Sequence, residues 1–261
     1  MLAYQPPART VRGAWRRRGP ARGGCPGAAG GYGAGVAAPR SASPTLPFAD
    51  RAEAGRALGA RLAELLGDFD RRPLLVLGLP RGGVVVAAEV ARALSAPLDA
   101  YVVRKLGLPG QPELAMGAIA GGGMLVRNED VISRAGVSAA DLDRVVTEER
   151  AELERRERAY RGDRAPVAPT GRLVIVVDDG LATGATARAA LRAVRAAAPA
   201  AVVLAVPVAP RRTVAELAGD ADRLVVLAQP RPFTAVGHYY RDFSPSTDDQ
   251  VRAVLTGSPP S

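Results

Sequence analysis

The chain has 261 residues, 48% of them apolar and 23% charged, so it can bury the core that a large domain needs. No stretch approaches the ~18 consecutive apolar residues that span a bilayer, so no membrane segment is expected. The net charge of +9 would fit a nucleic-acid-binding protein, but residues 1–47 hold seven arginines and no acid. Taking these seven charges from +9 leaves +2 for residues 48–261, so nucleic-acid binding is expected only weakly, through the tail.

Residues 1–47 consist mainly of Gly, Ala, Pro and Arg, and this composition predicts a disordered tail, because it offers little apolar surface to offset the entropy of ordering. The arginine run after Trp15 leads into Gly, Ala and Pro rather than leucines, so no export signal is expected. A solvated tail and a start site placed too far upstream both stay open. Cys25 is the only cysteine, which excludes an intrachain disulfide and fits a cytoplasmic protein.

The folded domain, residues 48–261, is expected to begin with a helix. Asp50 followed by Glu53 has the spacing of a capping box, and leucines then recur at helical spacing. The predicted inner face of this helix comprises Leu58, Leu62, Leu65 and Leu66.

A strand, a glycine turn, a buried helix and a second strand follow. The first strand is expected at residues 73–79, the turn at 80–83, the helix at 84–94 and the second strand at 98–103. This βαβ order is typical of an α/β sheet.

The middle of the domain, about residues 107–171, is less regular. Residues 115–126 predict a hairpin, because three glycines interrupt the apolar pattern there. Residues 138–160 predict a charged helix whose acids and arginines are spaced to pair with one another on a solvated face.

Alternating strands and helices then resume. Strands are expected at residues 173–177, 201–208 and 224–227, and helices at 185–197 and 211–217. The arginines along the first of these helices are interpreted as a solvated face. The expected fold class is α/β, an open parallel sheet with helices on both faces.

The loop after strand 173–177 carries the strongest functional signal. Asp178 and Asp179 end the strand, and a small-residue loop to Thr186 opens a helix. Ligands of an open parallel sheet lie beyond the carboxyl ends of its strands, and a helix N-terminus binds phosphate. The two carboxylates repel phosphate and need hydroxyls or a cation instead. A sugar with neighbouring hydroxyls and a phosphate satisfies both requirements.

Other phosphate-binding motifs are absent from the sequence. There is no Gly-x-x-x-x-Gly-Lys-[Ser/Thr], and no Gly-x-Gly-x-x-Gly follows a strand. A plain strand-to-helix turn with two surface acids is the structural alternative. A hydrolase that uses Asp178 as its nucleophile would need a downstream acidic metal cluster, which the sequence lacks.

An apolar strand, two acids and Thr-Gly-Ala-Thr at residues 183–186 resemble the signature of the type I phosphoribosyltransferases. Leu79-Pro80-Arg81-Gly82-Gly83 is similar to the family's pyrophosphate-binding loop, and Lys105, the only lysine, stands where the family has a basic residue. The segment at about 107–171 corresponds to the family's mobile loop. Residues 112–118 and 236–244 resemble a subgroup of uncharacterised members.

The resemblance implies a Mg²⁺-dependent enzyme of nucleotide metabolism that uses phosphoribosyl pyrophosphate. Its Mg²⁺ would be held by the diphosphate, the ribose hydroxyls and water, without direct protein ligands. Asp178 and Asp179 would be catalytic, through the ribose hydroxyls and the positive charge that grows at C1. The implied substrate-binding residues are Arg81, Gly82, Gly83, Arg104, Lys105, Asp178, Asp179, Gly180, Leu181, Ala182, Thr183, Gly184, Ala185 and Thr186.

The acceptor is implied to be a nitrogenous base or another small molecule. Ala182 stands where hypoxanthine and guanine enzymes carry an aspartate, so that subgroup is not favoured. The family covers the base with a hood, expected here at about residues 230–255, and Phe233 and Tyr240 are the candidate acceptor-binding residues. His238 is interpreted as structural, and Glu113 receives no role.

A second hypothesis is a regulatory module that senses phosphoribosyl pyrophosphate without catalysis and touches nucleic acid through its tail. The nearly neutral core and the absence of nucleic-acid-binding motifs speak against it. Because family members are often dimers, the resemblance also allows a homodimer.

Overall fold

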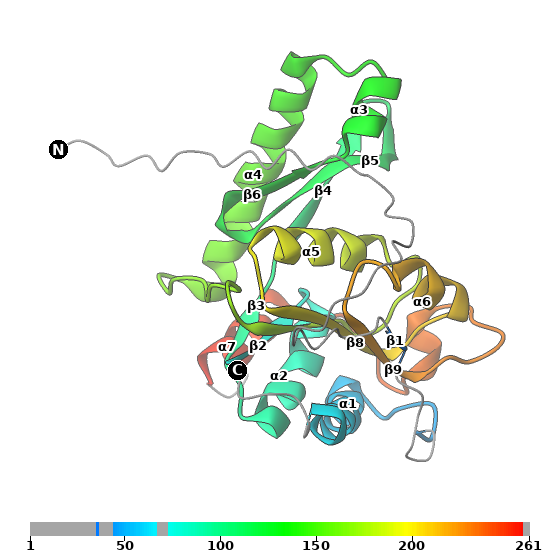
Figure 1. Ribbon diagram of the computed structural model, residues 1–261. Coiled ribbons are helices and arrows are strands. Elements are labelled where there is room, and N and C mark those ends of the chain that lie inside the picture. The colour runs from blue at the N-terminus through cyan, green and yellow to red at the C-terminus, as the bar shows by residue number, and fades with distance from the viewer. Residues whose placement is uncertain (1–34, 37–43, 67–72, 258–261) are drawn as a thin grey trace, which may run out of the picture. The chain divides into compact units, whose positions relative to one another are not determined.

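The structure, a computed structural model, describes residues 35–36, 44–66 and 73–257, which all belong to one unit spanning Gly33–Ser261. Its centre is a sheet with the strand order β1-β9-β8-β7-β2-β3, in which every neighbouring pair is parallel (Figure 1). In that order the strands are Gly35–Val36, Arg223–Ala228, Ala201–Val208, Leu173–Val177, Leu74–Gly78 and Leu98–Ala100.

Helices cover both faces of this sheet, which confirms the expected fold class. On one face, α1 (Arg51–Leu66) and α2 (Gly82–Leu94) pack against alternate strand residues such as Ile175. On the other face, α5 (Ala185–Ala196) and α6 (Arg211–Leu217) pack against the strand residues in between, such as Val176. Every residue of β7 and β8 is buried, as both faces of a parallel strand require.

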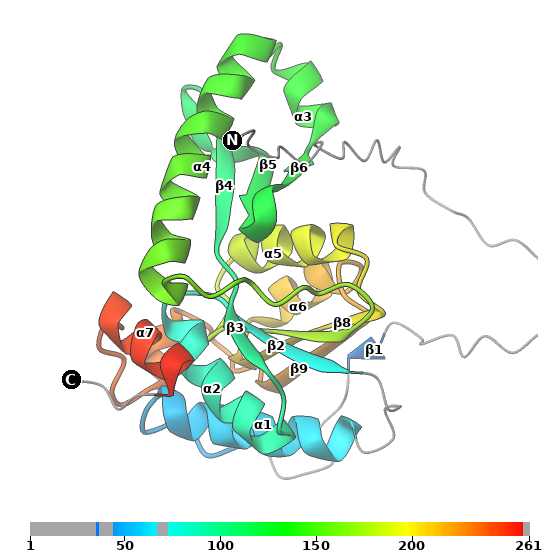
Figure 2. The same ribbon diagram turned by 90° about the vertical axis from the view of Figure 1, so that its left-hand side faces the viewer.

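A second, antiparallel sheet lies between β3 and β7 in the sequence, beside the long helix α4 (Ala139–Arg161) (Figure 2). It comprises β4 (Val103–Leu108), β5 (Gln111–Ala120) and β6 (Met124–Arg127), followed by the short helix α3 (Glu129–Arg134). The predicted hairpin and charged helix are both present. We call residues 103–161 the insertion.

The predicted strand at residues 98–103 is wrong in one respect, because the main chain changes sheets within it. β3 ends at Ala100, and the Tyr101 N–H still donates to the Gly78 carbonyl at 2.9 Å. Val103 already belongs to β4, where it pairs with Ala120. The apolar residues 100–103 continue across the boundary between the two sheets, so the sequence pattern did not reveal it.

Beyond β9, the chain returns to the start of the domain. The segment after the 3₁₀ helix η2 (Val236–Tyr239) runs beside Phe48, whose N–H donates to the Tyr239 carbonyl at 2.9 Å. The helix α7 (Asp248–Thr256) then completes the described chain. Thr247 and Gln250 form a capping box at its start, a readable signal that the sequence analysis missed.

The predicted disordered tail, together with Cys25, falls mostly outside the described residues. The strand β1, at Gly35–Val36, departs from that prediction, since it pairs with β9. Among the helices of the described chain, none has the length and apolar character needed to cross a membrane.

Candidate functional site

Asp178 and Asp179 stand at the carboxyl end of β7, in the middle of the parallel sheet. One Asp178 carboxylate oxygen accepts the Asp179 N–H at 2.9 Å. Burial raises the pKa of both carboxyl groups, and the charge of Asp179 raises that of Asp178 further. Two neighbouring acids kept out of water in this way are stabilised by a proton, a cation or a hydroxyl-bearing ligand.

Arg51, in the first turn of α1, supplies part of that compensation. Its Nε lies 2.8 Å from Oδ2 of Asp179, and both side chains are mostly buried. The guanidinium acts against the rise in the pKa of both acids. Asp178 has no such partner at its side chain among the described residues, so the pair is only partly neutralised.

The loop from Gly180 to Gly184 forms a cradle of backbone N–H groups at the start of α5. Gly184 adopts φ +72°, a conformation that glycine tolerates best. Within the described residues, the N–H groups of Ala182, Thr183 and Gly184 donate to no protein acceptor. The Thr213 hydroxyl of α6 donates to the Ala182 carbonyl at 2.6 Å and so braces the cradle. This is the arrangement that binds phosphate at helix N-termini.

The side chains of this loop differ in burial. Leu181 is buried beneath the loop, where its N–H donates to the Val208 carbonyl at 2.9 Å. Ala182, Thr183, Ala185 and Thr186 are exposed. The Thr183 hydroxyl accepts the Ala185 N–H at 3.5 Å, and both threonine side chains are open to solvent.

The second predicted loop, Pro80 to Gly83, lies directly against the acids. A Cβ added to Gly82 would lie 2.0 Å from Oδ2 of Asp179, and one added to Gly83 would lie 2.8 Å from Cα of Asp178. Glycine is thus required at both positions for the loops to approach. The exposed Arg81 side chain lies next to them, with its NH1 3.8 Å from Asp248 of α7.

Arg104 and Lys105 lie on β4, on opposite faces because strand residues alternate. Arg104 is held inside the insertion, where its Nε lies 2.6 Å from Oε2 of Glu149 on α4. Lys105 shares the face of Val103, which packs against the core cluster that contains α5 residues. The structure therefore directs only Lys105 toward the α5 side of the insertion.

The C-terminal segment forms a wall beside the acids. The Tyr240 hydroxyl donates to the Asp179 carbonyl at 2.6 Å, and its ring, only 5% exposed, contacts Phe48 and Phe243. Burial raises the pKa of this phenol. Val236 closes over Gly180, where an added Cβ would lie 2.5 Å from its Cγ1. Sequence reasoning missed the support that Tyr240 gives to the acid loop.

The remaining predicted residues have the following positions. Phe233 packs on Tyr239 with ring centroids 5.1 Å apart, and Tyr239 donates to the Pro232 carbonyl at 2.9 Å. The exposed His238 lies 2.6 Å from the Thr234 hydroxyl through Nδ1. The side chain of Glu113 is outside the described part of the chain. A base-stacking role for Phe233 or Tyr240 stays a prediction.

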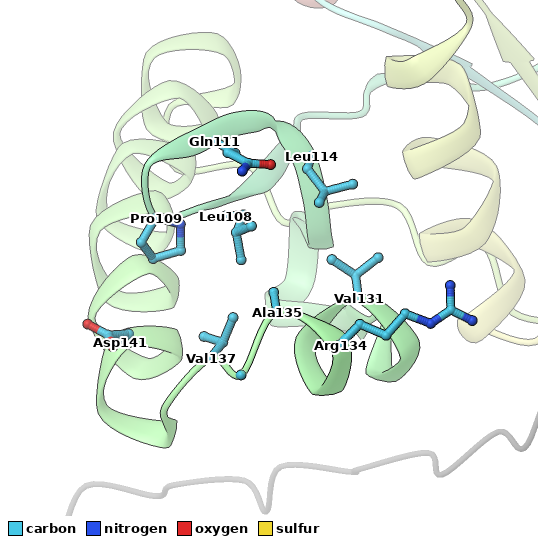
Figure 3. A pocket seen from close by; sticks show the side chains of 10 residues that line it. Leu108, Pro109, Gln111, Leu114, Val131, Arg134, Ala135, Val137 and Asp141 are labelled. Atoms are coloured by element: carbon cyan, nitrogen blue, oxygen red, sulfur yellow. The ribbon is translucent and has the colours of Figure 1, made fainter.

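A separate cavity of about 630 Å³ lies within the insertion, between the β4–β5 turn and the end of α3 (Figure 3). Its lining includes the apolar side chains of Leu108, Leu114, Val131 and Val137. None of the predicted site residues lines it. It is therefore distinct from the site at the acids.

The comparisons with known proteins agree with this geometry. Residues 49–229 match the family model described as "Phosphoribosyl transferase domain". Two Mycobacterium tuberculosis proteins, from strains H37Rv and CDC 1551, are 51% identical over 208 residues, or 80% of this chain. Their names are "Putative phosphoribosyl transferase Rv0571c" and "Putative phosphoribosyl transferase MT0597". The aligned part makes up 46% of those proteins, so the chain spans about half the length of the curated relatives it matches.

A solved structure matches the chain over nearly its whole length. The crystal structure of TT1426 from Thermus thermophilus has a TM-score of 0.74 and 44% sequence identity. The match covers 81% of this chain and 99% of the Thermus chain. Because the family model matches residues 49–229, the chain belongs to the phosphoribosyltransferase family.

Proposed function

We propose that the protein is a Mg²⁺-dependent transferase that moves the 5-phosphoribosyl group of phosphoribosyl pyrophosphate to a nitrogenous base or another small acceptor, releasing pyrophosphate. One observation carries this proposal. A buried pair of carboxylates and a cradle of unbonded N–H groups lie at the end of the same strand. A phosphorylated ribose carries hydroxyls on its ring and a phosphate at its 5-position, so the hydroxyls match the acids and the phosphate matches the N–H groups.

Each part of the substrate has a matching part of the chain. The N–H groups of Ala182 to Gly184 and the exposed hydroxyls of Thr183 and Thr186 receive the 5-phosphate. Asp178 and Asp179 accept the ribose hydroxyls. The glycine loop next to the acids, with the exposed Arg81, receives the diphosphate.

The donor set fits Mg²⁺ that arrives with the substrate. Within the described residues, no cluster of three or more His, Cys, Asp or Glu side chains can enclose a metal. Mg²⁺ prefers oxygen ligands and retains water, and it is commonly bound through one or two carboxylates together with substrate phosphates. When bound, the metal would neutralise charge on the departing diphosphate.

In the reaction, the bond between C1 and the diphosphate oxygen breaks, and the diphosphate leaves with the electron pair. The acids at residues 178–179 favour the positive charge that grows on the ribose. Arg81, with Lys105 from the insertion, favours the negative charge that grows on the diphosphate. A ring nitrogen of the acceptor then bonds to C1 from the opposite face, and its proton passes to the departing diphosphate or to water.

The acceptor enters beside the C-terminal wall. Val236, next to Gly180, gives this wall an apolar surface, and Phe233 is an aromatic residue of the segment that remains partly exposed. Ala182 leaves no carboxylate at the position that purine enzymes for hypoxanthine and guanine use. We propose an uncharged ring as acceptor, in the cytoplasm.

Isothermal titration of the full chain with phosphoribosyl pyrophosphate, with and without Mg²⁺, tests the proposal. Binding at micromolar concentration that requires Mg²⁺ is the expected result. Release of pyrophosphate in a screen of bases would then separate the transferase from the sensing module, which binds without turnover. Absence of binding under both conditions would overturn the proposal.

A further inference from the structure

Arg51 is held by three contacts from distant parts of the chain. Its Nε donates to Oδ2 of Asp179 at 2.8 Å, across 128 positions of sequence. Its NH1 donates to the Ser244 carbonyl at 2.8 Å, across 193 positions. Its Cζ lies 3.9 Å from the centre of the Phe243 ring, a cation–π contact.

These contacts fix the guanidinium as a rigid plane rather than as a mobile surface charge. Its side chain is only 12% exposed, and the rigid fork uses different nitrogens for the carboxylate and for the carbonyl. A lysine could supply the charge, but from a single nitrogen instead of the two nitrogens that contact Asp179 and Ser244. The arrangement therefore depends on the shape of arginine as well as on its charge.

The carboxylate of Asp179 is fixed by the same contacts. Arg51 engages Oδ2, and Gly82 packs against that same oxygen so closely that an added Cβ would lie 2.0 Å away. The Tyr240 hydroxyl holds the Asp179 main chain through its carbonyl. One oxygen of the carboxylate is thus immobilised from the side of α1, while the other is not used by Arg51.

We propose that Arg51 is a positioning residue that orients the Asp179 carboxylate for the ribose hydroxyls. The inference rests on the function proposed above. It adds to the site a residue, Arg51, that lies outside the family's loop motifs. Arg51 acts through Asp179, so its loss weakens ligands that carry ribose hydroxyls. Ligands that engage only the glycine loop should be affected less, because Arg51 lies against that loop only at Gly82, where an added Cβ would lie 2.7 Å from its Nε.

Calorimetry with two ligands separates these effects. Ribose 5-phosphate carries the hydroxyls, and inorganic pyrophosphate with Mg²⁺ does not. For Arg51→Met we expect binding of ribose 5-phosphate to weaken by about 10- to 100-fold, since a charge-assisted hydrogen bond is lost. Binding of pyrophosphate should change by less than about twofold.

Two further variants calibrate the result. Arg51→Lys should recover part of the lost affinity, because it keeps the charge near Asp179. Arg56→Met removes an exposed arginine from the same helix and should leave both affinities unchanged. If Arg51→Met does not fold, Phe243→Leu provides a milder test, since it removes the ring from the guanidinium and keeps the ion pair.

A double-mutant cycle tests whether Arg51 works through Asp179. The loss from Arg51→Met should be much smaller in an Asp179→Asn background than in the wild type, because interacting residues are not additive. Fully additive losses, equal losses for both ligands, or tighter ribose 5-phosphate binding by Arg51→Met would each overturn the inference. If the wild-type chain binds phosphoribosyl pyrophosphate but Arg51→Met binds ribose 5-phosphate normally, only this inference fails. If the wild-type chain binds neither phosphoribosyl pyrophosphate nor ribose 5-phosphate, the proposed function fails.

Discussion

At the scale of single residues, Asp178 is proposed to bind the substrate, but its buried charge lowers the stability of the fold. Burial and the neighbouring charge of Asp179 raise the pKa of its carboxyl group. A raised pKa means that the folded chain holds this proton more tightly than the unfolded chain does. The free energy of unfolding therefore falls as the pH rises from about 3.9, the ordinary value of an aspartate, through the raised folded-state pKa.

Asp178→Asn should therefore remove binding without loss of stability. The amide oxygen can still accept the Asp179 N–H, while the buried charge disappears. We expect thermal unfolding at pH 7 to occur at the same temperature as in the wild type or higher, with a weaker pH dependence. Affinity for phosphoribosyl pyrophosphate should fall by about 100-fold or more.

Asp163→Asn, which changes an exposed acid, serves as the control and should alter neither property. A lower unfolding temperature for Asp178→Asn at pH 7 would contradict the assignment of a strained, buried charge. Unchanged affinity in the folded variant would remove the hydroxyl-binding role of Asp178.

The residues of the site differ in how far the sequence could reveal them. Asp178 to Thr186 form one contiguous motif, so local sequence carried their strand, loop and helix. Arg51 is joined to Asp179 only by tertiary folding, and no local pattern encodes a contact between such distant positions. One signal was available, since a cation in the first turn of a helix opposes the helix dipole.

At the scale of elements, the insertion is attached to the central sheet through a buried charge cluster. Arg161, at the end of α4, lies 2.7 Å from Asp99 of β3 and 2.8 Å from Glu157 through different nitrogens. Asp99 also accepts the Val167 N–H at 3.0 Å. One ion pair thus joins β3, α4 and the chain that returns to β7.

Asp99→Asn should destabilise the fold by about 3–5 kcal/mol, because a buried guanidinium loses a charged partner. Urea unfolding followed by circular dichroism would measure the loss. The double variant with Arg161→Met should recover part of it, since the unpaired charge is then gone. A loss below about 1 kcal/mol, the range of a surface pair, would show that solvent reaches the cluster.

The elements themselves were largely predictable, and the exceptions have a common cause. Apolar periodicity identified the core strands and helices, because both faces of the sheet are buried. Periodicity could not show that β3 and β4 belong to different sheets, because the apolar residues 100–103 run from one strand into the other. It also gave no sign that Arg104 pairs with Glu149 of α4.

At the scale of the whole molecule, the positive charge is concentrated at one end of the sequence. Removal of residues 1–34 deletes six arginines and lowers the net charge from +9 to +3. We expect salt-sensitive adsorption of DNA to the full chain to disappear in the shortened chain, because few phosphate contacts remain. Fluorescence anisotropy at two salt concentrations would measure it. Nucleic-acid binding that survives the deletion at physiological salt would show that the domain itself contacts nucleic acid.

The bridge between Phe48 and Tyr240 has a consequence for biosynthesis. Arg51 leaves the ribosome early and Asp179 much later, but Phe243 and Ser244, which hold Arg51 in place, are made later still. A nascent chain still tethered at residue 239 has its phosphate cradle and both acids, yet lacks the hydroxyl that supports the Asp179 carbonyl. The contacts that hold Arg51 and Asp179 in place are thus complete only after Ser244 has been synthesised, and a chain that stops before Ser244 lacks one or more of them.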